Sequence, residues 1–416
     1  MSSSFYRVST ANMYDASLRN VSARQKSLVD LQENLTSGKR VVRPSDDPVA
    51  AAQAERALTR ISRIQAEQRA LEVQRNAIAQ AESTLGDAVG LVQEIRQLVV
   101  AAGGGTLKPE DRKTYASQIQ SLREQLTDVI NRKDTNGIPL LGALGSALEP
   151  FTGPLLANPD YLFAGLPGQT ASGTTYIPTT VDGHAALMFD PVRDGVYTAS
   201  VNRGPASTLV TSAITTTNRE ILAGAGYDMT ITAVTVDAAA GTTQVSYDLS
   251  KNGGPPISVT SPAVKTGQPI PITIAEGADT VMSFNLTGTP AVGDGIALQP
   301  SSSLMGTIDS AIRGLSGAAN SGEAAQAVGQ ALANIDAGLE RLHNVRGYAG
   351  ELLNRADRIT GDQENRSIQL EGDRSRAEDL DMIKGISDFE NANVGYQAAL
   401  QSYAQVQRLS LFDYLK

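Results

Sequence analysis

Two helical stripes, one near each end of the chain, flank a middle region without helical spacing, and this arrangement constrains the fold most. Both stripes repeat at alternate intervals of four and three residues. The N-terminal stripe consists of Tyr14, Leu18, Val21, Gln25, Leu28, Gln32 and Leu35. The C-terminal stripe consists of Ile386, Phe389, Asn393, Tyr396, Leu400, Tyr403 and Gln407. Such spacing forms the narrow face that coiled coils bury, so we expect the two ends to pair.

The segment between Thr36 and Pro48 predicts a helix end followed by a new helix start. Gly38 can end the first helix in a left-handed conformation, and Pro48 suits a first helical position. Asp46 and Asp47 are interpreted as helix-start residues rather than as an acid–base pair. A long helix is predicted from about Val49 to Ala102, because apolar residues recur every seven positions. They are Ile64, Leu71, Ile78, Leu85, Val92 and Val99.

The middle of the chain, from about Phe151 to Ser303, is rich in Thr, Gly, Ser and Pro. Apolar residues alternate with others in three short stretches, which predicts antiparallel strands. The stretches are Met229-Ile231-Ala233, Val245-Tyr247-Leu249 and Met282-Phe284-Leu286. Helical spacing returns from Leu304. We therefore predict a mainly α fold in which the terminal helices pair into an elongated coiled-coil-like bundle and a β-rich outer domain is inserted in the middle.

The composition provides no support for chemistry or for several kinds of partner. The chain has no cysteine, which excludes thiolate catalysis and cysteine metal ligands. Neither His184 nor His343 has a second histidine one helical turn away, so we expect no metal site. The net charge of −9 without a basic cluster argues against nucleic acid. No apolar run reaches the roughly 18 residues of a membrane span, so we expect no membrane insertion. Since no catalytic or ligand-binding motif is found, we also expect no cofactor and no enzyme activity.

Two motifs resemble the flagellin-like family, in particular its members at the junction between hook and filament. One runs from Leu35 through the sequence Thr-Ser-Gly-Lys-Arg-Val-Val-Arg to Pro44-Ser45-Asp46-Asp47-Pro48, and the other is the ending from Val406 to Leu415. Tyr161-Leu162-Phe163-Ala164-Gly165 is similar to a hairpin that leads into the outer domain of these proteins. Val292-Gly293-Asp294 and Gln299-Pro300-Ser301 resemble the exit from that domain. The resemblance covers roughly residues 1–165 and 292–416.

The resemblance implies a structural subunit of the bacterial flagellum that forms a ring between hook-associated protein 1 and flagellin. It implies export without a cleaved signal, with an export chaperone, to an extracellular position. It implies an inner tube of residues 1–42 and 380–416, a helical bundle of 43–165 and 304–379, and an outer domain of 166–303. Together with the stripes, it predicts the residues that contact neighbouring subunits along the axis: Leu18, Val21, Leu28, Leu35, Leu400, Tyr403, Leu409, Leu411 and Phe412.

Three alternatives remain open at the level of sequence. The nearest is flagellin itself, the filament subunit. A secreted enzyme with its active site in the insert is a second, although no nucleophile–base–acid spacing supports it. A third is an adhesin-like or glycan-bearing outer domain, since many Thr and Ser residues lie in the insert.

Overall fold

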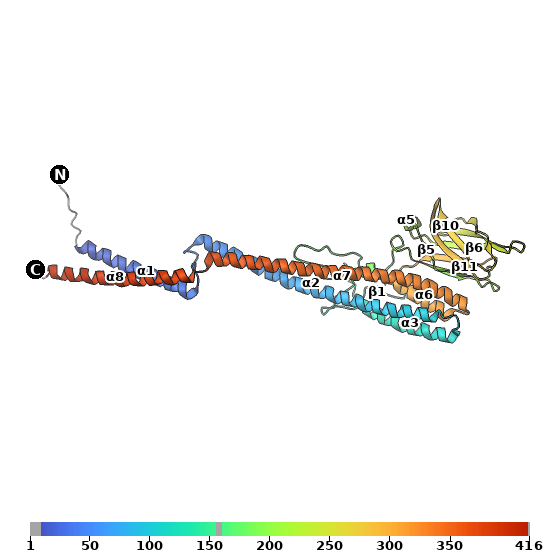
Figure 1. The fold of residues 1–416 in the computed structure, drawn as a ribbon, viewed down its shortest axis with the longest axis horizontal. Helices are drawn as coiled ribbons and strands as arrows, with labels where there is room; N and C mark the ends of the chain where they lie inside the picture. The colour runs from blue at the N-terminus through green and yellow to red at the C-terminus, as the bar shows by residue number, and fades with distance from the viewer. Residues whose placement is uncertain (1–9, 155–159, 415–416) are drawn as a thin grey trace. The chain divides into compact units, whose positions relative to one another are not determined.

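The computed structural model describes residues 10–154 and 160–414 (Figure 1). Its helices are α1 (Thr10–Ser37), α2 (Pro48–Ala102), α3 (Pro109–Ile130), α4 (Gly183–Leu187), α5 (Arg219–Leu222), α6 (Leu304–Gly317), α7 (Ser321–Glu378) and α8 (Met382–Tyr414). Its strands are β1 (Phe151–Thr152), β2 (Leu162–Phe163), β3 (Tyr197–Asn202), β4 (Val210–Thr211), β5 (Thr215–Thr216), β6 (Tyr227–Asp237), β7 (Thr242–Lys251), β8 (Ile257–Thr260), β9 (Val264–Lys265), β10 (Ile270–Glu276), β11 (Asp279–Thr287) and β12 (Gly295–Pro300). Helices on both sides of a β-rich middle confirm the predicted fold class.

The chain divides into two compact units. One unit is formed by Met1–Arg69 with Thr360–Lys416, and the other by Ala70–Ile359. In the first unit α1 packs along α8, which confirms the predicted pairing. A small apolar cluster of Val41, Ala50, Ala54 and Ala377 lies in the same unit. The three-part division predicted from the sequence remains a prediction.

A helical core occupies part of the second unit, where α2, α3, α6 and α7 contribute buried side chains. The predicted seven-residue repeat along α2 faces this core, since Leu71, Ile78, Leu85, Val92 and Val99 are all buried. The β1–β2 hairpin pairs Phe151 with Phe163, and both rings join the core, as expected for the segment around Phe163. Ion pairs such as Arg96 with Asp336 lie at its more exposed margin.

The β domain contains a six-stranded sheet in the order β3-β12-β6-β7-β8, with β9 also paired to β7. A four-stranded sheet has the order β10-β11-β4, with β5 also paired to β11. Side chains from both sheets share one apolar cluster. Ala233 is exposed, so its predicted place in the alternation with Met229 and Ile231 is wrong. The register of β6 shifts between Ile231 and Ala233, and this bulge moves the following residues to the other face.

Candidate assembly interface

The first compact unit presents α1 and α8 as a helix pair. Tyr14 and Tyr403 contact each other, with ring centroids 5.5 Å apart and a 2.8 Å hydrogen bond between their hydroxyl groups. This hydrogen bond raises the pKa of Tyr403. Further along the pair, a Cβ added to Gly385 would lie 3.2 Å from the Leu35 side chain. The two helices are therefore in contact at widely separated positions.

Exposure along the two helices defines the side that each turns to the other, which we call the paired face. On α1 it consists of Ser17, Val21, Leu28, Leu31 and Leu35, and on α8 of Gly385, Phe389, Ala392, Tyr396, Ala399 and Tyr403. Tyr14 is 36% exposed and joins this face through its contact with Tyr403. Four stripe positions were predicted one residue too late, because Leu18, Gln32, Ile386 and Leu400 are exposed while the residue before each of them is less exposed. Gln25 and Gln407 are exposed as well. Asn393, another position of the C-terminal stripe, is half-buried.

Small residues explain this offset. Gly385, Ala392 and Ala399 recur at intervals of seven on α8 and lie on the paired face. A Cβ at Gly385 would be only 2.7 Å from the Leu380 side chain, so a larger residue at that position would force Leu380 to shift. Small side chains let helix backbones approach closely, and a larger apolar residue beside them is then turned outward. Sequence spacing alone favours the larger apolar residues, and it therefore did not predict that small residues lie on the paired face.

Several apolar side chains on this unit therefore remain exposed, and we call them the outer apolar residues. They are Leu18, Val29, Ile383, Ile386, Val394 and Leu400. Leu18 is 47% exposed and Leu400 is 40% exposed, although the residue before each of them, Ser17 or Ala399, is half-buried on the paired face. Exposed apolar side chains that recur along one region are typical of surfaces that bind other proteins.

The nine predicted contact residues thus fall into three groups. Val21, Leu28, Leu35 and Tyr403 lie on the paired face within one chain. Leu18 and Leu400 are outer apolar residues. Leu409, Leu411 and Phe412 lie within α8, but their side chains are outside the described part of the structure. Leu31, which the sequence analysis missed, joins the paired face; its signal was the interval of three from Leu28 and of four to Leu35.

The connection between α1 and α2 is held to the end of α7. Gly38 has a φ of +71°, which agrees with the predicted left-handed helix end. Lys39 pairs with Glu378 at 3.0 Å, and the Arg40 guanidinium donates to the Ala377 carbonyl oxygen at 2.8 Å. Backbone hydrogen bonds from Arg40 N to Glu378 O and from Leu380 N to Gly38 O complete the junction. These contacts fix the connection between α1 and α2 against the end of α7.

Asp47 has the helix-start role predicted for the pair, whereas Asp46 stabilises the turn before the helix. Asp46 Oδ2 accepts hydrogen bonds from the backbone nitrogens of Val42 and Arg43. Asp47 Oδ1 accepts from Ala50 N at 3.0 Å and so caps α2. The hydrogen bond from Ala50, followed by the one from Arg40, lowers the pKa of Asp47. Both carboxylates are occupied by the turn that they stabilise.

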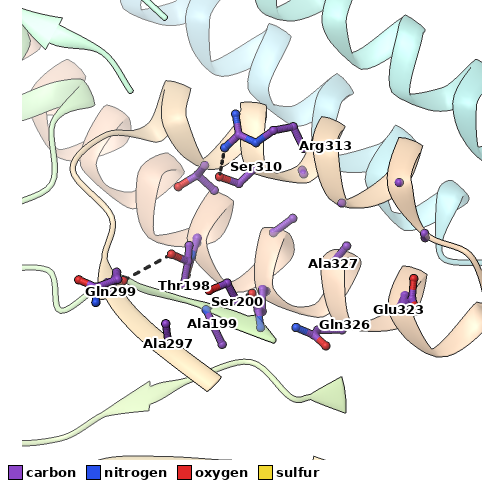
Figure 2. A pocket seen from close by; sticks show the side chains of 18 of the residues that line it. Thr198, Ala199, Ser200, Ala297, Gln299, Ser310, Arg313, Glu323, Gln326 and Ala327 are labelled. Carbon is purple, nitrogen blue, oxygen red and sulfur yellow. Dashed lines mark hydrogen bonds between the residues drawn. The ribbon is translucent and has the colours of Figure 1, made fainter. Parts of the chain in front are cut away.

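A hollow in the second unit lies between the β domain and helices α6 and α7 (Figure 2). It has a volume of about 510 Å³ and is lined by small and polar residues such as Ala199, Ser200 and Gln326. Across residues 10–154 and 160–414, His, Asp and Glu side chains form no group of three or more suited to a metal ion. Within these same ranges, no helix has both the length and the apolar character needed to cross a bilayer.

Helical ends that pair with each other and a β domain inserted between them in the chain are the features of flagellin-like proteins. The bacterial flagellin N-terminal helical region matches residues 8–144, and the bacterial flagellin C-terminal helical region matches residues 332–415. The two matches together span more than half of the chain. The chain belongs to the flagellin-like family, and this confirms the resemblance seen in its motifs.

Among individual relatives, flagellar hook-associated protein 3 of Salmonella typhimurium is 33% identical over 149 residues, which are 35% of this chain and 46% of the relative. The Escherichia coli protein of the same name is 34% identical over 150 residues, again 35% and 46%. Flagellin of Listeria monocytogenes is 29% identical over 126 residues, which are 30% of this chain and 44% of the relative. The chain spans about half the length of the curated relatives it matches.

Solved structures share the fold at lower identity. The hook-associated protein 3 of Legionella pneumophila aligns with a TM-score of 0.60 at 23% identity, covering 76% of this chain and 97% of the other. FlgL of Xanthomonas campestris aligns with a TM-score of 0.57 at 20% identity, covering 77% and 99%. The likeness therefore extends well beyond the terminal helices as an arrangement of the backbone.

Proposed function

We propose that this chain is the structural subunit that joins the flagellar hook to the filament, and that it acts by assembly and not by catalysis. The observation that carries the proposal is the helix pair with its outer apolar residues left exposed. The identity to two hook-associated proteins 3, which exceeds the identity to the Listeria flagellin, supports the junction over the filament.

In this proposal the α1–α8 pair has two distinct sides. The paired face holds the two helices of one subunit together. The outer apolar residues, among them Leu18 and Leu400, pack against neighbouring subunits in a ring. Fully burying an exposed Leu contributes about 1.5–3 kcal/mol, so a few such residues per subunit supply a substantial part of the association free energy. Leu409, Leu411 and Phe412 are proposed to extend this contact.

The ring would have hook-associated protein 1 on one side and flagellin on the other. Residues 1–42 and 380–416 are proposed to form the inner tube, 43–165 and 304–379 the surrounding helical layer, and 166–303 the outer domain. The subunit would be extracellular, exported through the flagellar channel without a cleaved signal and with the help of a chaperone. We propose no catalytic role, because the carboxylates of Asp46 and Asp47 already accept hydrogen bonds within the turn and because the family is structural.

A deletion strain complemented with variants tests this proposal. The variant Leu18→Asp with Leu400→Asp should leave hooks without filaments and release monomeric flagellin into the medium. Val73→Asp, which alters another exposed apolar residue on α2, is the matched control and should restore filaments. Hooks and filaments are counted by electron microscopy, and shed flagellin by immunoblot.

The same experiment distinguishes the junction subunit from the second candidate function, flagellin. If deleting this chain removes filaments while no other flagellin accumulates in the medium, and if the chain itself is found along whole filaments, it is the filament subunit. The 29% identity to the Listeria flagellin is the observation that favours this candidate. Normal filaments on a strain that lacks the chain would contradict both roles.

A further inference from the structure

The β domain and the helices beside it in the second unit do not share an apolar core. Val196 belongs to the helical cluster, whereas the next residue, Tyr197, belongs to the cluster of the β domain. On the return path Leu298 lies in the β cluster and Leu304 in the helical one. The two chain segments that connect these clusters are therefore short. Other contacts must hold the β domain against the helices.

A row of side-chain amides on α7 supplies such contacts. Gln326, Gln330 and Asn334 recur at intervals of four on one side of the helix. Gln326 Oε1 accepts from Thr211 N at 3.2 Å, and Asn334 Nδ2 donates to the Tyr197 carbonyl oxygen at 3.1 Å. Figure 2 shows Gln326 beside Ala199 and Ser200 of β3.

Gln330, in the middle of the row, contacts both sheets. Its Oε1 accepts from Ala199 N in β3 at 3.3 Å, and its Nε2 donates to Thr211 Oγ1 in β4 at 2.9 Å. One helical turn before Gln326, Glu323 forms an ion pair with Arg203, which follows β3. The four positions 323, 326, 330 and 334 thus form one polar row from helix to domain.

These amides occupy the place of a missing strand. β3 ends the six-stranded sheet and β4 lies at the border of the four-stranded sheet, so each has backbone groups without a neighbouring strand on one side. Exposed strand edges promote unwanted pairing, and proteins cover them. The amides of the α7 row form hydrogen bonds with backbone groups at both edges.

Polar cover of this kind can be released without exposing an apolar core. A hydrogen bond between two protein groups contributes little net stability, because both groups can bond water instead. The hollow of about 510 Å³ lies directly beside the row and is lined by Gln326, Gln330 and Asn334 themselves. Water in that hollow could therefore solvate the amides and the strand edges once they separate.

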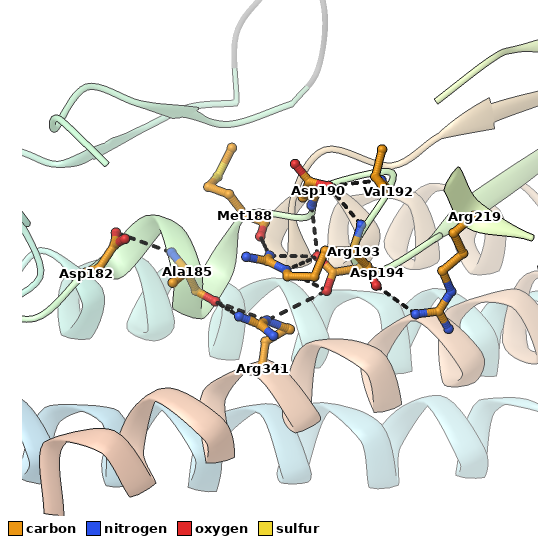
Figure 3. Close-up of polar contacts among 9 residues, drawn as sticks. All are labelled: Asp182, Ala185, Met188, Asp190, Val192, Arg193, Asp194, Arg219 and Arg341. Carbon is orange, nitrogen blue, oxygen red and sulfur yellow. Dashed lines mark hydrogen bonds and ion pairs between the residues drawn. The ribbon is translucent and has the colours of Figure 1, made fainter. Parts of the chain in front are cut away.

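We propose that the amide row is a reversible latch, which sets the orientation of the β domain on α7 and lets the domain swing when it opens. The entry segment then serves as the pivot (Figure 3). There the Arg341 guanidinium donates to the Ala185 carbonyl oxygen and lies 3.7 Å from Asp194, and Arg219 donates to the Arg193 carbonyl oxygen. Arg341, which holds the pivot from α7, lies about two helical turns after Asn334, the last amide of the latch.

Spin labels measure this motion in the full-length chain. The chain has no cysteine, so Ser117→Cys on α3 and Thr235→Cys on β6 give a unique labelled pair at exposed positions. The unaltered latch should give a narrow distance distribution. The latch variant Gln326→Ala, Gln330→Ala, Asn334→Ala should broaden or shift it, with helix and sheet content unchanged by circular dichroism.

The matched control replaces three exposed amides on the same helix, Asn344→Ala, Asn354→Ala and Gln369→Ala, and should keep the narrow distribution. A narrow distribution in the latch variant would overturn the proposal. So would a distribution that is already broad with the latch intact.

If the latch variant does not fold, hydrogen exchange in the chain without latch substitutions tests whether the latch opens. Opening should expose the backbone amides of Ala199 and Thr211 together. We expect them to exchange about tenfold or more faster than amides at the centre of β6, the factor that the loss of one net hydrogen bond gives. Equal protection of these amides and the sheet centre would overturn the latch.

Discussion

At the scale of single residues, two leucines on α1 have opposite roles. Leu31 lies half-buried on the paired face, whereas Leu18 is 47% exposed. Leu31→Ala should lower the free energy of unfolding by about 1–2 kcal/mol, less than for a fully buried Leu. Leu18→Ala should change it by less than about 0.5 kcal/mol, as is usual for surface sites. Thermal unfolding of α-helical signal measures both, and an equal loss would contradict the assignment of the two faces.

A buried ion pair in the helical core gives a second residue-scale prediction. Arg123 of α3 and Asp309 of α6 lie 2.9 Å apart with only 16% and 7% of their side chains exposed. The Arg123 Nε–H is close but not aimed at the carboxylate, and Asp309 Oδ2 has no hydrogen-bond partner within the described residues. Arg123→Met should therefore lower stability by about 3–5 kcal/mol, because it leaves a buried charge unpaired. Denaturant unfolding measures the loss.

The same pair predicts a pH dependence. Burial raises the pKa of Asp309 above its ordinary value, against the opposing influence of Arg123. The folded chain thus holds this proton more tightly than the unfolded chain, and the stability that this gives at acidic pH is lost as pH rises through the raised pKa. Asp309→Asn cannot titrate, so its stability relative to the unaltered chain should increase as pH rises from about 4 towards neutrality. A relative stability that falls over this range would contradict the direction of the shift.

At the scale of elements, the close approach of α1 and α8 depends on small residues. Gly385→Leu should weaken the pair by about 1–3 kcal/mol, because the new side chain would overlap Leu380 and crowd Leu35. Gly347→Ala is the control, since nothing lies within 4 Å of its Cβ position on α7. It should stabilise the helix by about 0.5–1 kcal/mol. Helix content on heating distinguishes the two, and a tolerated Leu at position 385 would disprove close packing there.

Periodicity in the sequence predicted where the helices and strands lie better than it predicted which side of each is buried. The long helix α2 begins at Pro48 and ends at Ala102, within one residue of the prediction, because Pro48 and Gly103 mark its limits locally. The outward turn of Leu18 and Leu400 depends on which partner helix lies opposite, and a single sequence does not contain that. The bulge after Ile231 is equally invisible to a period of two, because it arises from pairing with β7. The amide row on α7 looks like an ordinary polar face until β3 and β4 are placed beside it.

At the scale of the whole molecule, assembly should depend on the C-terminal part of α8 more than folding does. Removing Ser410–Lys416 should abolish ring formation while the core around Leu85 and Ile335 keeps its stability. The reason is that this core lies in the second compact unit, whereas the deleted residues belong to the first. Filament formation in cells and thermal unfolding of the purified chain test the two halves separately. Normal motility with the truncated chain would refute the role given to this segment.

The central claim is that the outer apolar residues of the α1–α8 pair are buried by neighbouring subunits. A high-resolution electron cryomicroscopy reconstruction of the assembled hook–filament junction tests it most directly. We predict that Leu18 and Leu400 pack against adjacent molecules there, while Val21 and Tyr403 keep their contacts within one chain. A junction in which Leu18 and Leu400 remain in solvent, or in which α1 and α8 separate, would contradict the claim.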